Sequence, residues 1–125
     1  MTERPVKTIL HVEDDYSIRM SIEHILQDEG YIVHSASNGR EALDFLSTHP
    51  NEIDLIFIDV MMPVMDGFAF CAEQSKDKSI AHIPVIVYSA DERNKSKAES
   101  IGLQFISKPF SINDLFEGIA RYAGK

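Results

Sequence analysis

The stretch Ile53-Asp-Leu-Ile-Phe-Ile-Asp59, followed at once by Val-Met-Met-Pro-Val-Met-Asp-Gly67, decides the fold of this chain. Its first part is almost continuously apolar until Asp59, which is typical of a central strand covered on both faces. Pro63 and the pair Asp66-Gly67 then favour a turn. The strand therefore delivers a carboxylate to one edge of a sheet.

Strand-like and helix-like segments alternate five times along the chain. The expected strands are 6–12, 31–36, 53–59, 83–89 and 104–108. The expected helices are 16–29, 39–48, 66–76, 91–101 and 111–123. Apolar residues at helical spacing mark the inner faces of the first and last helices: Ile18, Ile22, Ile25 and Leu26, and Ile112, Leu115, Phe116, Ile119 and Tyr122. This alternation predicts an α/β fold, with a parallel sheet, right-handed crossovers and helices on both faces.

Length and composition narrow the classes of protein that the chain can belong to. Its 125 residues suit a single domain, 1–125. No apolar run approaches the ~20 residues that cross a membrane, and the N-terminus lacks a secretory pattern. The single cysteine, Cys71, cannot form an internal disulfide, which favours the cytoplasm. The net charge of −8 argues against direct binding of nucleic acid.

Polar side chains follow four of the five expected strands. Glu13 and Asp14 come after the first strand, Asp59 ends the third, Ser89 ends the fourth and Lys108 ends the fifth. The carboxyl ends of parallel strands share one edge of the sheet, so these groups are expected to meet there. Carboxylates at close range repel one another unless a cation lies between them. Because Mg²⁺ prefers oxygen ligands and bridges to phosphate, the pattern predicts a site for Mg²⁺ and a phosphoryl group.

Plainer interpretations of the same residues remain open at this point. Asp59 can cap a turn, and Ser89 can cap the helix expected at 91–101. Asp15 suits the N-terminus of the first helix, with Arg19 as its i+4 partner. Lys108 can be an ordinary solvated lysine. A serine-hydrolase site is a poor alternative, because no histidine is placed to activate Ser89.

The motifs, taken together and in order, resemble the response-regulator receiver domain, the phosphoacceptor module of two-component signalling. They are V-E-D-D at 12–15, D-x-x-M-P-x-M-D-G at 59–67, Ser89-Ala90, and Lys108-Pro109-Phe110. The resemblance covers essentially the whole chain. It implies a flavodoxin-like, doubly wound sheet of five parallel strands in the order 2-1-3-4-5, with five helices.

The resemblance also implies a role for each site residue. Asp59 would accept a phosphoryl group from a phosphohistidine of a sensor histidine kinase or histidine phosphotransfer protein. Glu13, Asp14, Asp59 and the backbone carbonyl of Met61 would hold Mg²⁺, Glu13 through water. Ser89 and Lys108 would bind phosphoryl oxygens, and a cis peptide bond to Pro109 would turn Lys108 toward Asp59.

Ser89 and Phe105 are the implied switch residues, through which phosphorylation would change binding of a downstream target that the sequence does not identify. Dimerisation on phosphorylation is also open. The chain departs from the family pattern in three places. Phe105 stands where tyrosine is frequent, and residue 13 is glutamate rather than aspartate. The segment from Gly102 to Lys108 is one residue shorter than usual.

Two other functions compete with the signalling switch. One is a Mg²⁺-dependent phosphatase or phosphotransferase of the haloacid-dehalogenase type, which would place a second carboxylate two residues after the nucleophile, where this chain has Met61. The other is a degenerate receiver that is never phosphorylated and only binds partners. A receiver would be no enzyme beyond promoting its own phosphorylation and slow dephosphorylation. Fold argues only weakly between these functions, so the site residues must decide.

Overall fold

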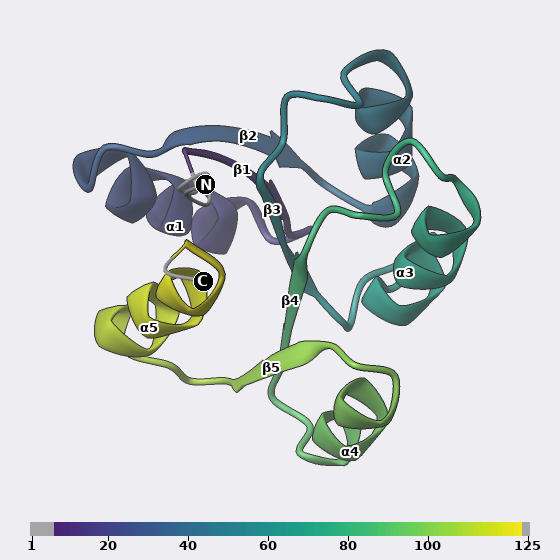
Figure 1. Cartoon of the computed structure of the whole chain (residues 1–125). Helices are drawn as coiled ribbons and strands as arrows, with labels where there is room; N and C mark the ends of the chain where they lie inside the picture. The colour runs from purple at the N-terminus through teal and green to yellow at the C-terminus, as the bar shows by residue number, and fades with distance from the viewer. Residues whose placement is uncertain (1–6, 124–125) are drawn as a thin grey trace.

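One sheet of five parallel strands forms the centre of the molecule, and five helices flank it (Figure 1). The computed structural model describes residues 7–123. The strands are β1 (Thr8–Val12), β2 (Ile32–Ala36), β3 (Leu55–Asp59), β4 (Val85–Ser89) and β5 (Gln104–Ser107). The helices are α1 (Tyr16–Asp28), α2 (Gly39–Thr48), α3 (Gly67–Lys76), α4 (Arg93–Ser100) and α5 (Ile112–Ala123). The strand order is β2-β1-β3-β4-β5, which confirms the predicted topology and makes β3 the central strand.

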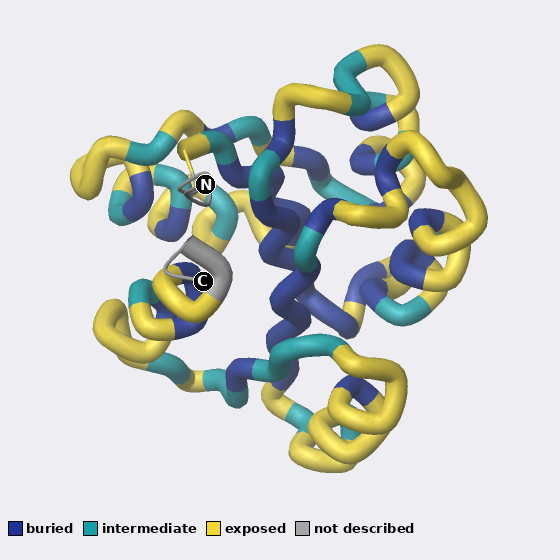
Figure 2. Tube along the Cα trace, in the orientation of Figure 1, coloured by how far each residue is buried: buried dark blue, intermediate teal, exposed yellow. Residues whose placement is uncertain are grey.

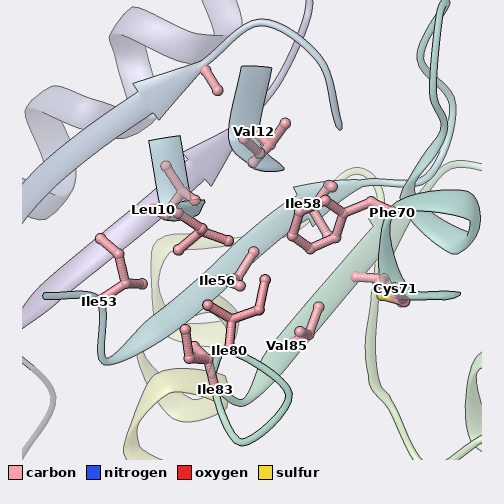
Figure 3. Packing of buried hydrophobic residues seen from close by; sticks show 14 of the residues in the cluster. Leu10, Val12, Ile53, Ile56, Ile58, Phe70, Cys71, Ile80, Ile83 and Val85 are labelled. Carbon is pink, nitrogen blue, oxygen red and sulfur yellow. The ribbon is translucent and has the colours of Figure 1, made fainter. Parts of the chain in front are cut away.

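The helices cover both faces of the sheet, as the alternating pattern predicts (Figure 2). α1 and α5 pack on one face, where Leu26 and Leu115 are buried. α2, α3 and α4 pack on the other, and Figure 3 shows Phe70 of α3 against Ile58 of β3 in this layer. Every residue of β3 is buried. Among the helices of residues 7–123, none combines the length and apolar character needed to span a bilayer.

Strands β3 and β4 each begin two residues later than the sequence predicts. β3 begins at Leu55 rather than Ile53, because the Asp54 carboxylate accepts hydrogen bonds from the backbone N–H groups of Lys7 and Thr8 and forms a side-chain link to β1. β4 begins at Val85 rather than at residue 83. The N–H of residue 83 is used in a turn, and the proline that follows it has no N–H to donate.

Two of the apolar residues assigned to inner helix faces are exposed, and those assignments were wrong. Ile18 of α1 and Ile112 of α5 each lie in the first turn of their helix, with 37% and 51% of their surface exposed. Helix packing begins one turn later, at Ile22 in α1 and Leu115 in α5. The side chain of Tyr122 lies outside the described residues.

Side-chain caps explain where several helices begin. Asp15 accepts from the N–H of Ile18 at the start of α1, as predicted. Ser111 accepts from Asp114 N–H before α5, also as predicted. Ser89 does not cap α4: the N-cap position is Glu92, which makes no side-chain cap hydrogen bond. The alternative reading of Ser89 as a helix cap was therefore wrong.

Candidate functional site

Asp59 lies at the last position of β3, at the carboxyl edge of the sheet, and only 3% of its surface is exposed. Its Oδ1 accepts from the backbone N–H of Met61 at 3.1 Å. Its Oδ2 accepts from Lys108 Nζ, also at 3.1 Å. A buried carboxylate with both oxygens engaged has a fixed orientation, which a reacting group requires.

Glu13 and Asp14 follow β1 and lie beside Asp59. One carboxylate oxygen from each of the three residues can be chosen so that all lie within 4.8 Å of one another. Glu13 is buried, whereas Asp14 is exposed. The register of β1 on β3 pairs Val12 with Ile58, which brings the residues after each strand together. The predicted carboxylate cluster is thus confirmed in its geometry.

Lys108 comes directly after β5 and reaches across β4 into the cluster. Its Nζ lies 3.1 Å from Asp59 Oδ2 and 3.8 Å from Glu13 Oε1, and its side chain is 26% exposed. The peptide bond to Pro109 is cis, as predicted. Lys108 is therefore not a free surface lysine, because it partly neutralises two buried carboxylates.

Ser89 is fully buried at the end of β4. Its Oγ accepts from the backbone N–H of Asp91 and from the side-chain amide of Asn94, each at 3.0 Å. A hydroxyl has two acceptor positions and one proton. Because both acceptor positions are used, the proton is left for donation to another acceptor. The contact with Asn94 also ties the site to α4.

Burial, with a smaller contribution from the charge of the neighbouring Asp59, raises the pKa of Glu13 to about 7. Hydrogen bonds from the Tyr88 hydroxyl and from the Asp15 N–H act in the opposite direction, because they stabilise the charged form. The repulsion between carboxylates expected from the sequence is present, but burial is the larger cause of the raised pKa of Glu13. A cation bound between the carboxylates would favour the ionised form of Glu13.

The sequence reasoning missed two residues of this region, His11 and Tyr88. Both are fully buried, and His11 Nε2 lies 2.8 Å from the Tyr88 hydroxyl, which donates to Glu13 Oε1 at 2.7 Å. Burial lowers the pKa of His11 to about 3 and raises that of Tyr88 well above its usual value. The only sequence signal was a histidine inside an otherwise apolar strand.

The remaining predicted residues are Met61, Phe105 and Arg19. The Met61 side chain is exposed, and the backbone N–H of Met61 donates to Asp59 Oδ1. Phe105 is half-buried on β5, pairs in register with Val87, and packs on the α2–α4 side of the sheet. Arg19 donates to the carbonyl oxygen of Glu13 at 2.7 Å, which holds the loop after β1 in place.

The donor set fits a hard divalent cation. All three carboxylates offer oxygen, the ligand type that Mg²⁺ prefers, and they leave room for waters because Asp14 is exposed. A cavity of about 870 Å³ lies elsewhere, between α3 and α4, and is lined by residues such as Phe68, Lys97 and Leu103. None of the three carboxylates lines that cavity. The site is therefore identified by the side chains gathered at the sheet edge and not by a deep cavity.

The response regulator receiver domain family matches residues 9–120 of the chain. The chain belongs to this family. The receiver domain is also similar to solved structures. One is a signal receiver domain of a signal transduction histidine kinase from Syntrophus aciditrophicus. The two share 36% sequence identity and a TM-score of 0.84, over 94% of this chain and 90% of the other. The predicted receiver fold is thereby confirmed.

Two further comparisons bear on function. Protein PilG of Pseudomonas aeruginosa is 34% identical over 115 residues, which cover 89% of this chain and 83% of that protein. The receiver domain of the sensor histidine kinase PA1611 from P. aeruginosa PAO1 has a TM-score of 0.82 and 25% identity, over 96% of this chain and 99% of that one, and its structure holds a magnesium ion in the active-site cleft. The chain spans about half the length, or less, of the first curated relatives that it matches.

Proposed function

We propose that this receiver domain accepts a phosphoryl group on Asp59 from a phosphohistidine and thereby switches the binding of a partner. The observation that carries the proposal is the Asp59 carboxylate itself. It is buried, held by Lys108 at 3.1 Å, and grouped with the carboxylates of Glu13 and Asp14. An isolated turn cap needs none of these neighbours.

The reaction forms one bond and breaks one. A carboxylate oxygen of Asp59 attacks phosphorus, the phosphorus–nitrogen bond of the phosphohistidine breaks, and the electron pair returns to the imidazole nitrogen. The product on this chain is an acyl phosphate. Lys108 already touches Asp59 Oδ2 and is placed to bind a phosphoryl oxygen, as phosphoryl-transfer sites require.

Ser89 supplies the second protein contact to the phosphoryl group. Its oxygen accepts from Asp91 and Asn94, so its proton is the part of the hydroxyl that a phosphoryl oxygen can receive. Moving toward Asp59 would stretch the contact with Asn94 of α4 and open space near Phe105. Phosphorylation would in this way be transmitted to α4 and β5.

We also propose that Glu13, Asp14, Asp59 and the Met61 carbonyl hold Mg²⁺. The carboxylate cluster and the magnesium ion in the related PA1611 receiver domain support this assignment. The chemistry supplied by a bound Mg²⁺ is neutralisation of charge on the transferring phosphoryl oxygens. Glu13 has both oxygens engaged by protein donors, which suits a contact through water.

The competing functions lack a comparable observation. In the haloacid-dehalogenase alternative, residue 61 would be a carboxylate, but it is an exposed methionine. A pseudo-receiver would not need the acceptor, the lysine and the hydroxyl together. We therefore propose a signalling phosphoacceptor that promotes only its own phosphorylation and slow dephosphorylation. It would receive its phosphoryl group in the cytoplasm from a histidine kinase or phosphotransfer protein.

The output is proposed to run through α4, β5 and α5, to a downstream protein or to a second copy of the domain. α4 suits an element that shifts, because a single residue of it, Ala98, is buried. Hydrogen exchange before and after phosphorylation tests this: binding or dimerisation should protect α4, β5 and α5. Protection confined to α2 and α3 would contradict it.

Phosphorylation itself is tested with acetyl phosphate, by measuring intact mass with Mg²⁺ and with EDTA. We expect a phosphoryl adduct in the wild-type protein with Mg²⁺, and none in Asp59→Asn. Asp15→Asn is the matched control, because asparagine caps a helix as well as aspartate and Asp15 is outside the cluster. An adduct that persists in Asp59→Asn, or that forms equally in EDTA, would contradict the proposal.

A further inference from the structure

A chain of buried polar side chains crosses the sheet beneath the site. His11 comes from β1 and Tyr88 from β4, and the central strand β3 lies between these two strands. The chain passes over the ring of Phe57, whose centroid is 4.3 Å from that of Tyr88 and 5.5 Å from that of His11. It ends on Glu13, so it links the interior of the sheet to the carboxylate cluster.

The direction of the hydrogen bonds follows from counting protons. A Glu13 that binds a cation must be ionised and is then only an acceptor, so in that state the single hydroxyl proton of Tyr88 must point to Glu13 Oε1. The Tyr88 oxygen must then accept from His11, which requires the proton of the neutral imidazole to be on Nε2. His11 Nδ1 is left as a bare acceptor, and it has no hydrogen-bond partner among the described residues.

The other tautomer of His11 is worse on two counts. It would bury an N–H at Nδ1 without an acceptor, a costly arrangement in a protein interior. It would also make Nε2 an acceptor, so that the Tyr88 proton would turn to His11 and leave Glu13. One arrangement of protons therefore satisfies the whole chain.

We propose that Tyr88 is a positioning residue for the cation site, with its hydroxyl directed by His11 onto Glu13. This inference rests on the proposed function, because it assigns Glu13 to the cation. Tyr88 fixes Oε1 of Glu13 and the backbone N–H of Asp15 fixes Oε2, at 2.7 and 3.1 Å. The carboxylate is thus held in place before any ligand arrives. Loss of a partner of a direct metal ligand typically lowers metal affinity about 10–100-fold, and because Glu13 is proposed to act through water we expect the lower end of that range.

The first test is the affinity of Tyr88→Phe for Mg²⁺, measured by calorimetric titration with magnesium chloride on the unphosphorylated chain. Phenylalanine keeps the ring contacts with Phe57 and Phe110 and removes only the hydroxyl. We expect binding about tenfold weaker than wild type. Tyr31→Phe is the matched control: it removes a hydroxyl from a half-buried tyrosine of the same apolar layer, and should leave the affinity unchanged.

A purely structural role for Tyr88 would lower the unfolding midpoint and leave Mg²⁺ affinity unchanged. Affinity of Tyr88→Phe within twofold of wild type therefore overturns the inference while leaving the proposed function intact. If the wild-type protein binds no Mg²⁺, the proposed function fails and the positioning role for the cation fails with it. The two failures are distinguished by the wild-type titration alone.

A second test needs no variant. Nitrogen-15 NMR of the wild-type imidazole distinguishes the tautomers, and we expect His11 to be neutral with its proton on Nε2 at neutral pH. A proton on Nδ1 would mean that the Tyr88 hydroxyl donates to His11 rather than Glu13. That result would overturn the inference even if Tyr88→Phe failed to fold.

Discussion

Gly67, the first residue of α3, is expected to be intolerant of even a methyl group. A Cβ at this position would lie 2.9 Å from the carbonyl oxygen of Asp59 and 3.0 Å from Cα of Val60. Both are backbone atoms of the segment that carries Asp59, the proposed phosphoacceptor, so they cannot rotate aside. The Gly67 N–H donates to the Val60 carbonyl at 3.0 Å, which holds the helix and the strand end at this close approach.

Gly118 in α5 provides a matched control for the same substitution. A Cβ there would also be crowded, at 2.8 Å from Gln104 Nε2 and 3.1 Å from Ile106 Cδ1. These atoms are the ends of flexible side chains and can move. Gly118→Ala should therefore keep most of the gain in helix propensity, which is about 1 kcal/mol for replacing a helical glycine by alanine.

The expected size of the Gly67→Ala effect follows from two opposing terms. Overpacking against a fixed neighbour costs about 1–3 kcal/mol. The helix-propensity gain offsets at most about 1 kcal/mol of this. The free energy of unfolding should thus fall by about 1–2 kcal/mol, which for a domain of this size lowers Tm by about 4–8 °C.

Urea and thermal unfolding followed by far-UV circular dichroism measure both variants. Gly118→Ala is expected to be as stable as wild type or more stable, by up to about 1 kcal/mol. Equal stability of the two variants, or a Gly67→Ala protein as stable as wild type, would refute the reasoning from backbone contact. Gly67→Ala is also expected to phosphorylate more slowly, because relief of the contact displaces Asp59.

Three further outcomes are expected. Lys108→Ala should lose most phosphorylation at Asp59 yet bind Mg²⁺ about fivefold more tightly, because the variant removes a repulsion of about 1 kcal/mol between Lys108 and the cation. Intact mass measures phosphorylation and calorimetry measures Mg²⁺ affinity. Unchanged values for both would contradict the role proposed for Lys108. Ser89→Ala should still accept a phosphoryl group but lose most of the shift in Phe105 ring resonances, since the lost charge-assisted hydrogen bond is worth about 1.5–3 kcal/mol; an equal shift without the hydroxyl would disprove the coupling. Burial raises the pKa of Cys71 to about 12, so at pH 8 it should resist iodoacetamide in the native protein and react after unfolding in urea, as mass spectrometry will show; rapid alkylation of the folded protein would be inconsistent with this packing.

The sequence was sufficient for the strand that carries Asp59, because an apolar run that ends in a carboxylate and a turn needs no tertiary information to be read. It was also sufficient for α2, whose predicted bounds 39–48 agree with the structure. Asn38 and Glu41 form a local cap there, with Asn38 accepting from Glu41 N–H and Glu41 accepting from Ser37 N–H. Local hydrogen bonding decides such a boundary.

Other boundaries depend on contacts that are distant in sequence. The start of β3 depends on Asp54 reaching Lys7 and Thr8 of the neighbouring segment. The exposure of Ile112 depends on how far α5 reaches over the sheet, which helical spacing alone does not specify. The local pattern was compatible with the predicted start of β3 and with an inward-facing Ile112, and tertiary packing decided against both.

The His11–Tyr88–Glu13 chain could not be found from sequence spacing. It depends on register across three strands, which pairs His11 with Phe57 and Asp59 with Tyr88. The sequence distances between its members, 75 and 77 residues, carry no recurring pattern. A buried histidine needs a polar partner, but the strand that carries it does not identify that partner.

The central claim is that Asp59 becomes an acyl phosphate, and reductive trapping tests it most directly. After reaction with acetyl phosphate and Mg²⁺, borohydride reduces an acyl phosphate and converts the acceptor aspartate to homoserine, which peptide mass spectrometry locates. Homoserine is expected at position 59 and at none of positions 14, 15 and 66. Homoserine at any of those three positions, or unmodified Asp59 in a sample whose intact mass shows the phosphoryl group, would contradict it.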